Sequence, residues 1–288
     1  AGHAGCEAAL VSARLGVPTL LVTMDKNAIA RMSCNPSVGG IAKSHLVYEL
    51  DALGGEMGRN ADFTGIQFRM LNTRKGPAVQ ATRIQSDKDA YHRRMRAVIE
   101  GTPGLTILEG TVSELLTSAG AVSGIKLEDG TEVRAKAVIL TAGTFLRGRI
   151  HIGDRNYPGG RNGERSAERL GLALEKMGFT VARLKTGTPA RLTKDSVDYS
   201  KMTIQPGNEP PPFFSWEAGK FHVEQTASTG GGGEHMFHME HPGPLCPWKP
   251  GSDQIPCWLT HTTKATHDII RTNLSRSSMY GGQISGTG

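Results

Sequence analysis

Cysteine is scarce in this sequence, and the few cysteines lie far apart. The 288 residues contain four of them, and no two form a Cys-x-x-Cys pair: Cys6, Cys34, Cys246 and Cys257. A disulfide scaffold of the kind found in small secreted proteins needs more numerous and more closely spaced cysteines. This argues against a secreted disulfide framework and favours a reducing, cytoplasmic compartment.

The sequence also lacks a long hydrophobic run. No apolar stretch approaches the roughly 20 residues that cross a bilayer, and no signal peptide is recognisable at the first residue, Ala1. Hydrophobic residues make up 38% of the chain, which contains 37 glycines. This composition is typical of a soluble protein with one large or two moderate domains, and we expect no membrane association.

Acidic residues are nearly absent from one stretch. Residues 69–96 contain eight basic and two acidic residues, so this segment accounts for the whole chain's net charge of +6. The basic residues are Arg69, Arg74, Lys75, Arg83, Lys88, Arg93, Arg94 and Arg96. We interpret the segment as a basic stripe that binds a polyanion such as RNA; a solvated helix face is the alternative.

The basic stripe ends in a predicted amphipathic helix. Ile84, Tyr91, Met95 and Val98 recur at helical spacing and are expected to face the core. On this interpretation His92, Arg93 and Arg96 point outward, where the two arginines can meet an anion.

The first residues of the chain predict a dinucleotide-binding turn. Gly2 and Gly5 have the spacing of the last two glycines of a G-x-G-x-x-G fingerprint, and an Ala-rich helix follows to about Leu15. A buried strand at residues 19–23 completes part of a βαβ unit. The glycines would let the backbone approach a pyrophosphate at the helix N-terminus. The usual ribose-binding acid is not evident after this strand, where Asp25 lies slightly late.

A single cysteine stands in an unusual turn sequence. Cys34 is followed by Asn35-Pro36 and then by a Gly-Gly pair. We expect a helix over residues 37–53, whose N-terminus would lie beside the Cys34 sulfur and favour the reactive thiolate. A buried, unreactive cysteine is the alternative.

The order of the following segments is typical of a flavoprotein. The pattern predicts a strand at 106–112, a hairpin of 121–127 and 132–135 around Asp129-Gly130, and a buried strand over 136–144 ending in a small-residue turn. We predict a Rossmann-like, two-dinucleotide α/β fold of the glutathione-reductase type with a β-meander, followed by part of a second α/β domain.

The domains are expected to meet near residue 147. Residues 1–146 would form the dinucleotide-binding domain, and 147–288 a second, truncated domain with a helix at 166–177, strands at 181–189 and 255–262, and a helix at 267–274. A Gly/His/Pro-rich loop at 226–251 contains His235, His238, His241 and Cys246. These could bind zinc, but we interpret the segment as a surface loop and assign no metal.

Collinear motifs run through nearly the whole chain. They are Gly2-His3-Ala4-Gly5-Cys6-Glu7-Ala8, Met32-Ser33-Cys34-Asn35-Pro36, Asp51-Ala52-Leu53-Gly54-Gly55, Gly65-Ile66-Gln67-Phe68, Lys75-Gly76-Pro77-Ala78-Val79, Ala81-Thr82-Arg83, Gly143-Thr144-Phe145-Leu146, Arg183-Leu184-Lys185-Thr186-Gly187-Thr188-Pro189 and Thr260-His261-Thr262. With these motifs the sequence resembles the MnmG/GidA family of tRNA-modifying flavoproteins over residues 1–225 and 252–288; residues 226–251 look like an insertion.

This resemblance implies an enzyme that binds FAD and acts with the GTPase MnmE. Together they add a (carboxymethyl)aminomethyl group to carbon 5 of the tRNA wobble uridine, with a methylene-tetrahydrofolate as carbon source and NADH as reductant. It also implies a homodimer and a catalytic role for Cys34. The implied FAD-binding residues are Ala1, Gly2, His3, Ala4, Gly5, Val112, Gly143 and Ser166. The residues expected to contact RNA or substrate are Lys75, Arg83, Arg93, Arg94 and Arg96.

Several alternatives remain open. The chain departs from the family pattern at both ends, where the first strand and a second important cysteine would lie, so we interpret it as a fragment. A folate- and FAD-dependent tRNA uridine methyltransferase and a non-catalytic RNA-binding flavoprotein scaffold are the competing functions. A pyridine-nucleotide disulfide reductase is disfavoured because Cys34 has no neighbouring cysteine. The source compartment is bacterial cytoplasm, or mitochondria if the organism is eukaryotic. Cys6 and Cys257 are expected to be buried packing residues.

Overall fold

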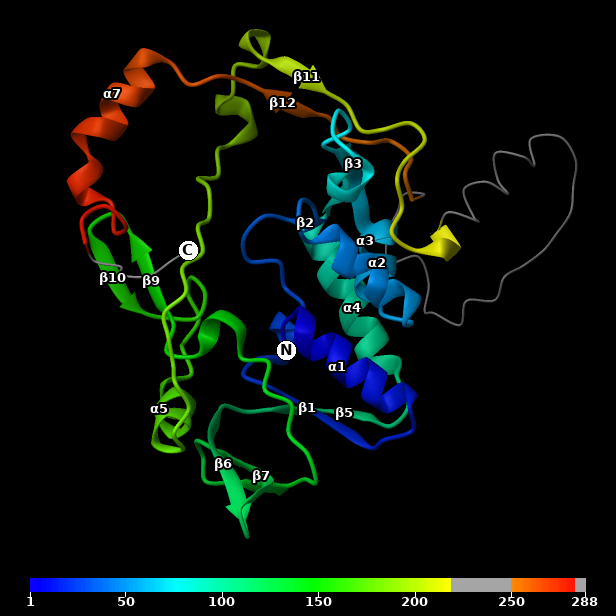
Figure 1. Ribbon diagram of the computed structural model, residues 1–288, viewed down its shortest axis with the longest axis vertical. Coiled ribbons are helices and arrows are strands. Elements are labelled where there is room, and N and C mark those ends of the chain that lie inside the picture. The colour runs from blue at the N-terminus through cyan, green and yellow to red at the C-terminus, as the bar shows by residue number, and fades with distance from the viewer. Residues whose placement is uncertain (219–249, 283–288) are drawn as a thin grey trace, which may run out of the picture. The chain divides into compact units, whose positions relative to one another are not determined.

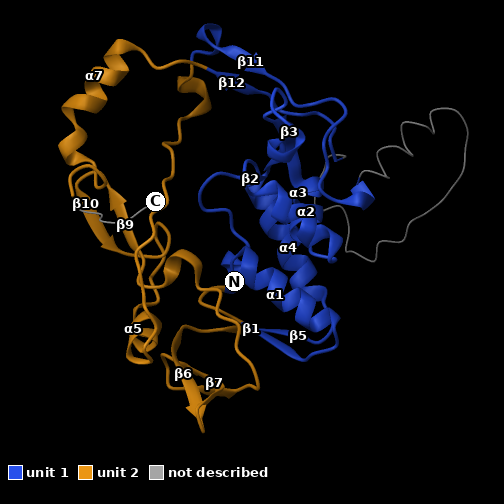
Figure 2. Ribbon diagram, viewed as in Figure 1, with its two compact units in different colours: residues 1–21, 26–107, 198–259 blue, residues 22–25, 108–197, 260–288 orange. Residues whose placement is uncertain are grey.

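The computed structural model describes residues 1–218 and 250–282 (Figure 1). The chain divides into two compact units (Figure 2). Unit 1 contains Ala1–Leu21, Lys26–Ile107 and Asp198–Leu259; unit 2 contains Val22–Asp25, Leu108–Val197 and Thr260–Gly288. Each unit is thus assembled from segments distant in sequence, and the domain boundary expected near residue 147 stays a prediction.

A helix and a parallel strand pair follow the glycine turn. Helix α1 (His3–Arg14) begins after Gly2, and Gly16, in the left-handed region with φ +79°, lets the chain leave it. Strands β1 (Thr19–Thr23) and β5 (Leu105–Glu109) pair. The Thr19 N–H donates to the Gly104 carbonyl and the Gly110 N–H to that of Thr23, so the strands run in the same direction. The Rossmann-like α/β prediction is confirmed here.

A three-stranded antiparallel sheet and three helices form the core of unit 1. The sheet has the order β2 (Ser37–Gly39), β4 (Ala81–Ser86), β3 (Gly65–Leu71). The helices are α2 (Ser44–Ala52), α3 (Met57–Thr64) and α4 (Lys88–Gly101). Phe68 and Ile84 of the sheet are fully buried in one cluster with Tyr91 and Met95 of α4. The Asp87 carboxylate caps α4 by accepting the Asp89 and Ala90 N–H groups.

A returning segment completes unit 1. Strands β11 (Thr203–Gln205) and β12 (Cys257–Leu259) form an antiparallel pair. This pair is joined to β3, because the Ile255 N–H donates to the Ile66 carbonyl and the Asn208 N–H donates to that of Phe68. The contacts explain why residues 198–259 belong with the first hundred residues.

Unit 2 is richer in strands than in helices. The antiparallel meander β6 (Val112–Ser118), β7 (Ala121–Leu127), β8 (Glu132–Arg134) confirms the predicted hairpin, with Gly130 at φ +92° in its turn. Helix α5 (Glu168–Lys176) packs against β6. The remaining elements are β9 (Arg149–Ile152), β10 (Arg155–Pro158) and α7 (Lys264–Thr272). In the described residues no helix is long and apolar enough to cross a membrane.

The predicted helix over residues 37–53 is wrong in its first half. Residues 37–39 instead form β2 and pair with β4, and α2 begins at Ser44. Gly39 and Gly40 adopt φ values of +80° and +92°, which interrupt a right-handed helix. The argument for a helix N-terminus directly after Cys34 therefore no longer applies.

Two strands expected from apolar runs do not form. Residues 136–142 and 181–189 are not strands in the structure. Ile139 is 65% exposed and Leu140 44% exposed, against the expectation of burial. A strand exists through hydrogen bonds to a neighbouring strand, and the described residues supply no such neighbour for these runs.

Candidate functional site

The glycine turn of unit 1 presents backbone amides rather than side chains. Gly2 is the N-cap of α1, no side chain caps this end, and the first turn contains no acidic residue. A Cβ placed on Gly2 would meet no atom within 4 Å, so the space directly beside Gly2 is open. The N–H groups of a helix's first turn lack intrahelical acceptors, and they attract anions. The predicted residues Ala1, His3, Ala4 and Gly5 lie in this turn, which fits a pyrophosphate.

The turn is supported from behind by buried side chains. The His3 ring lies edge-on against that of Tyr91, with centroids 5.5 Å apart. Cys6 is fully buried, and this burial raises the pKa of its thiol to about 12. Cys6 is therefore a packing residue, as predicted from the sequence.

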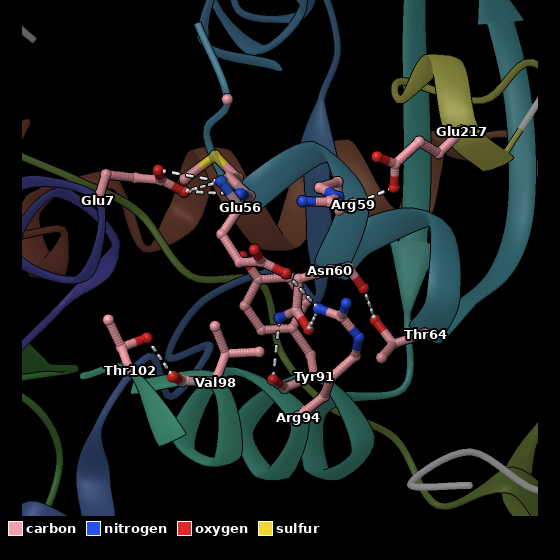
Figure 3. A network of polar contacts seen from close by, with 12 residues as sticks. Glu7, Glu56, Arg59, Asn60, Thr64, Tyr91, Arg94, Val98, Thr102 and Glu217 are labelled. Atoms are coloured by element: carbon pink, nitrogen blue, oxygen red, sulfur yellow. Dashed lines mark hydrogen bonds and ion pairs between the residues drawn. The ribbon is translucent and has the colours of Figure 1, made fainter. Parts of the chain in front are cut away.

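A buried polar network joins α1, α3 and α4 (Figure 3). The Glu7 carboxylate accepts the backbone N–H groups of Glu56 and Met57, at 3.1 and 2.6 Å, and so caps α3 from another helix. Glu56 in turn forms ion pairs with Arg94 at 2.8 Å and Arg14 at 2.9 Å. Burial acts to raise the pKa of Glu56, but the charge and hydrogen bond of Arg94, together with the contributions of Arg14 and Arg59, outweigh it, and the pKa is lowered.

Arg94 belongs to this network and not to the exposed face of α4. Its guanidinium is buried, bonds Glu56 and the Asn60 amide oxygen, and lies 4.8 Å from the Phe63 ring centroid. Because the charge of Arg94 is matched by Glu56 inside unit 1, we do not expect this side chain to contact RNA.

The other predicted RNA-contacting residues occupy three elements. Arg93 is exposed on α4, while Arg96 is half-buried and bonds Glu100 and Asn27. Lys75 is exposed in the turn between β3 and β4. Arg83 lies on β4. The basic stripe is thus spread over two strands, their turn and a helix, and Ile84 belongs to β4 rather than to the predicted helix.

Cys34 lies in a loop that is tied to the glycine turn. The Ala30 N–H donates to the Ala1 carbonyl at 2.9 Å, four residues before Cys34. The Ser86 N–H donates to the Pro36 carbonyl at 2.7 Å, two residues after it. Cys34 itself is half-buried. These two bonds bring the predicted catalytic cysteine and the predicted pyrophosphate-binding turn into one unit.

The remaining predicted cofactor residues lie in unit 2. Val112 begins β6, Gly143 begins a 3₁₀ turn, and Ser166 precedes α5. The Ala167 N–H donates to the Phe145 carbonyl at 2.8 Å, so the segments carrying Gly143 and Ser166 are bonded to each other. The Ser166 hydroxyl donates to the Glu168 carboxylate at 2.7 Å.

The sequence interpretation missed a polar cluster on the sheet of unit 1. Gln67 and Arg69 of β3 alternate with core residues, as do Arg83 and Gln85 of β4. This period of two was a usable signal.

Cys257 was expected to be a buried packing residue, but it is half-buried and forms polar contacts. Its sulfur accepts the Gln85 amide N–H at 2.8 Å and donates to the Gln67 oxygen at 3.1 Å.

No group of three or more His, Cys, Asp or Glu side chains suited to a metal occurs in residues 1–218 and 250–282. His235, His238, His241 and Cys246 lie outside the described residues.

The glycine turn, the parallel strand pair and the β-meander define an α/β protein of the Rossmann type. The chain belongs to the family described as glucose inhibited division protein A, GidA, whose profile matches residues 1–230 and 240–288. The predicted insertion over residues 226–251 is therefore longer than the segment that the family profile leaves unmatched, which is residues 231–239.

Relatives and solved structures agree with this assignment. The chain is 48% identical over 288 residues to proteins of Geobacter sulfurreducens and Bacillus subtilis, each named tRNA uridine 5-carboxymethylaminomethyl modification enzyme MnmG. The structure of Aquifex aeolicus GidA matches with a TM-score of 0.82 and 44% identity, over 100% of this chain and 44% of that one. This chain covers 41% of the length of those two relatives.

Proposed function

We propose that this chain is the flavin-binding part of an enzyme that modifies the wobble uridine of tRNA by adding a (carboxymethyl)aminomethyl group at carbon 5. The names of the relatives support the reaction. The observation that carries the proposal is the backbone tie between the glycine turn and the Cys34 loop, because it holds an anion-binding turn and a half-buried thiol in one compact unit.

In this proposal the backbone amides at Gly2 to Gly5 hold the FAD pyrophosphate. Val112, Gly143 and Ser166 are further FAD contacts. When bound, the flavin supplies redox chemistry, and NADH and a methylene-tetrahydrofolate supply electrons and carbon. The partner is a GTPase of the MnmE type, and the assembly is a cytoplasmic homodimer.

Cys34 is the proposed catalytic residue. Carbon 5 of uracil becomes nucleophilic once a nucleophile adds to carbon 6 or a base enolises the ring, and a thiol can serve in addition or in proton transfer. Lys75 and Arg93, both exposed, are the proposed contacts for the tRNA backbone, and Arg96 lies on the same helix as Arg93.

The test uses the full-length parent protein. We expect flavin absorbance bands that bleach with NADH under anaerobic conditions, and modified wobble uridine when tRNA, methylene-folate and the GTPase are supplied. The Cys34→Ser variant should keep the flavin spectrum and lose product by at least about 100-fold, whereas Ser33→Ala, an exposed neighbour, should retain activity. A folded protein without flavin after FAD addition would contradict the cofactor, and full activity of Cys34→Ser would contradict the catalytic role.

A further inference from the structure

The face of the β2-β4-β3 sheet that points away from the core carries two arginines directly opposite each other. Arg69 of β3 pairs in register with Arg83 of β4, next to the pair Gln67 and Gln85. The alternate residues Phe68 and Ile84 are fully buried on the core face, so the four polar side chains share the other face. On its second side Arg83 is opposite Gly39, which has no side chain.

Two like charges at opposed positions of neighbouring strands destabilise a sheet, and nothing in the described residues neutralises this pair. No ion pair joins either arginine to a carboxylate in residues 1–218 and 250–282. Arg69 donates one bond, from Nη1 to the Pro206 carbonyl at 2.9 Å. The Nε atoms of both arginines are buried without an acceptor. Buried donors without an acceptor are uncommon in folded proteins, and a bound ion or water is one explanation for them.

The neighbouring polar groups satisfy one another and leave the arginines as the unmatched part of the cluster. The Gln85 amide donates to the Gln67 oxygen at 3.0 Å and to the Cys257 sulfur, and the Gln67 amide donates to the Gln205 carbonyl at 3.0 Å. These bonds fix the glutamines and close one side of the cluster with neutral groups. What remains is a concentrated double positive charge held on a rigid sheet.

We propose that Arg69 and Arg83 together bind the carboxylate of a small amino acid that donates the amine in the modification reaction. Paired guanidinium groups hold carboxylates by strong, directional hydrogen bonds. A carboxymethylamino group, which the relatives' name contains, is a nitrogen separated from a carboxylate by one methylene, as in glycine. The inference therefore rests on the proposed function and assigns its amine-donor site.

The exposure of the two side chains favours a small anion over the tRNA backbone. Arg69 and Arg83 are both half-buried, whereas Lys75 and Arg93 are exposed. The phosphate backbone of a polynucleotide contacts fully exposed cations more readily than half-buried ones. A carboxylate with one methylene is small enough to accept hydrogen bonds from the remaining guanidinium donors of both arginines.

The test compares two amine donors in the full-length enzyme with its GTPase partner. With glycine as donor, Arg83→Gln and Arg69→Gln should each raise KM at least about tenfold, which corresponds to the loss of a charge-assisted hydrogen bond. With ammonium, which has no carboxylate, KM should not change. Arg83→Lys should recover part of the glycine affinity, and Arg155→Gln, an exposed arginine of unit 2, should match the wild type with both donors.

A binding measurement makes the site testable even without turnover. Glycine should raise the melting temperature of the full-length protein while glycinamide does not, and Arg83→Gln should abolish the difference. Equal losses with glycine and ammonium, weaker tRNA binding in the two variants, or no discrimination between glycine and glycinamide would overturn the proposal. A wild-type enzyme that modifies tRNA with neither donor would instead contradict the proposed function, and the melting experiment would still decide the carboxylate site.

Discussion

Single residues of α4 show how one arginine differs from the next. Arg93 and Arg94 are adjacent in the sequence, yet one is exposed and the other is enclosed by Glu56, Asn60 and Phe63. Arg94 lies three residues after Tyr91, so the two share the buried face of the helix. The helix period could place Arg94 on that face, but the identity of its partner Glu56, on another helix, could not be read from the sequence.

This difference gives opposite expectations for the two arginines. Arg94→Ala leaves the buried Glu56 carboxylate without its main partner, and we expect a loss of about 3–5 kcal/mol in the free energy of unfolding. Arg93→Ala should change this free energy by less than about 0.5 kcal/mol and weaken tRNA binding instead. Urea unfolding and a tRNA-binding titration at fixed salt distinguish the two. Equal stability of both variants would contradict the structural role of Arg94.

Secondary-structure elements depended on tertiary contacts to different degrees. Helices α1, α4 and α5 and the hairpin around Asp129-Gly130 were predicted, because their hydrophobic periods and turn residues are local properties. The segment after Cys34 was not, because residues 37–39 become a strand by pairing with β4, which is more than 40 residues away. Local propensity is too weak to decide such a case against strand pairing.

The segment 213–218 is held to α3 by one buried carboxylate. Asp62 accepts the Phe214 and Ser215 N–H groups at 2.9 and 2.7 Å. The Phe214 ring packs edge-on against Tyr48, with centroids 5.1 Å apart. Burial raises the pKa of Asp62 to about 7, although the two backbone hydrogen bonds act in the other direction. The attachment of this segment is therefore expected to depend on pH.

The direction in which stability changes with pH follows from proton linkage. In the unfolded chain the aspartate loses its proton near pH 4, and in the folded chain near pH 7, so the folded state holds more protons between these values. Stability contributed by Asp62 should be fully present below about pH 4 and should fall as the pH rises toward 7. Asp62→Asn cannot ionise and loses one hydrogen-bond acceptor, so the variant should have a lower free energy of unfolding than the wild type at pH 5. The difference in free energy of unfolding between the two should become smaller by pH 8. Chemical unfolding at both pH values tests this, and a constant gap would refute it.

In the described residues, the two units of the chain differ in how many hydrophobic side chains they bury. The connected core cluster, from Cys6 to Phe214, lies entirely within unit 1. In unit 2 the buried apolar residues are fewer, and include Ile125, Leu127, Leu170 and Leu174. Resistance to local opening follows the number of buried apolar contacts.

We therefore expect slower backbone hydrogen exchange in unit 1. Peptides covering β4 and α4 should be protected at least about tenfold more strongly than peptides covering β6 and β7, and mass spectrometry of the 288-residue chain measures this. Equal protection in the two regions would show that the units open together.

The local pattern of this sequence was sufficient for the Rossmann-type beginning, the β-meander, the amphipathic basic helix and the family, because glycine turns, hydrophobic periods and ordered motifs lie within short stretches of chain. Three features depended on contacts between distant segments: the enclosure of Arg94 by Glu56, the tie between Ala1 and the Cys34 loop, and the opposition of Arg69 and Arg83. Each joins residues that are distant in sequence and are brought together by folding. The period of two in β3 and β4 indicates a polar face, but it does not show which residues lie opposite each other.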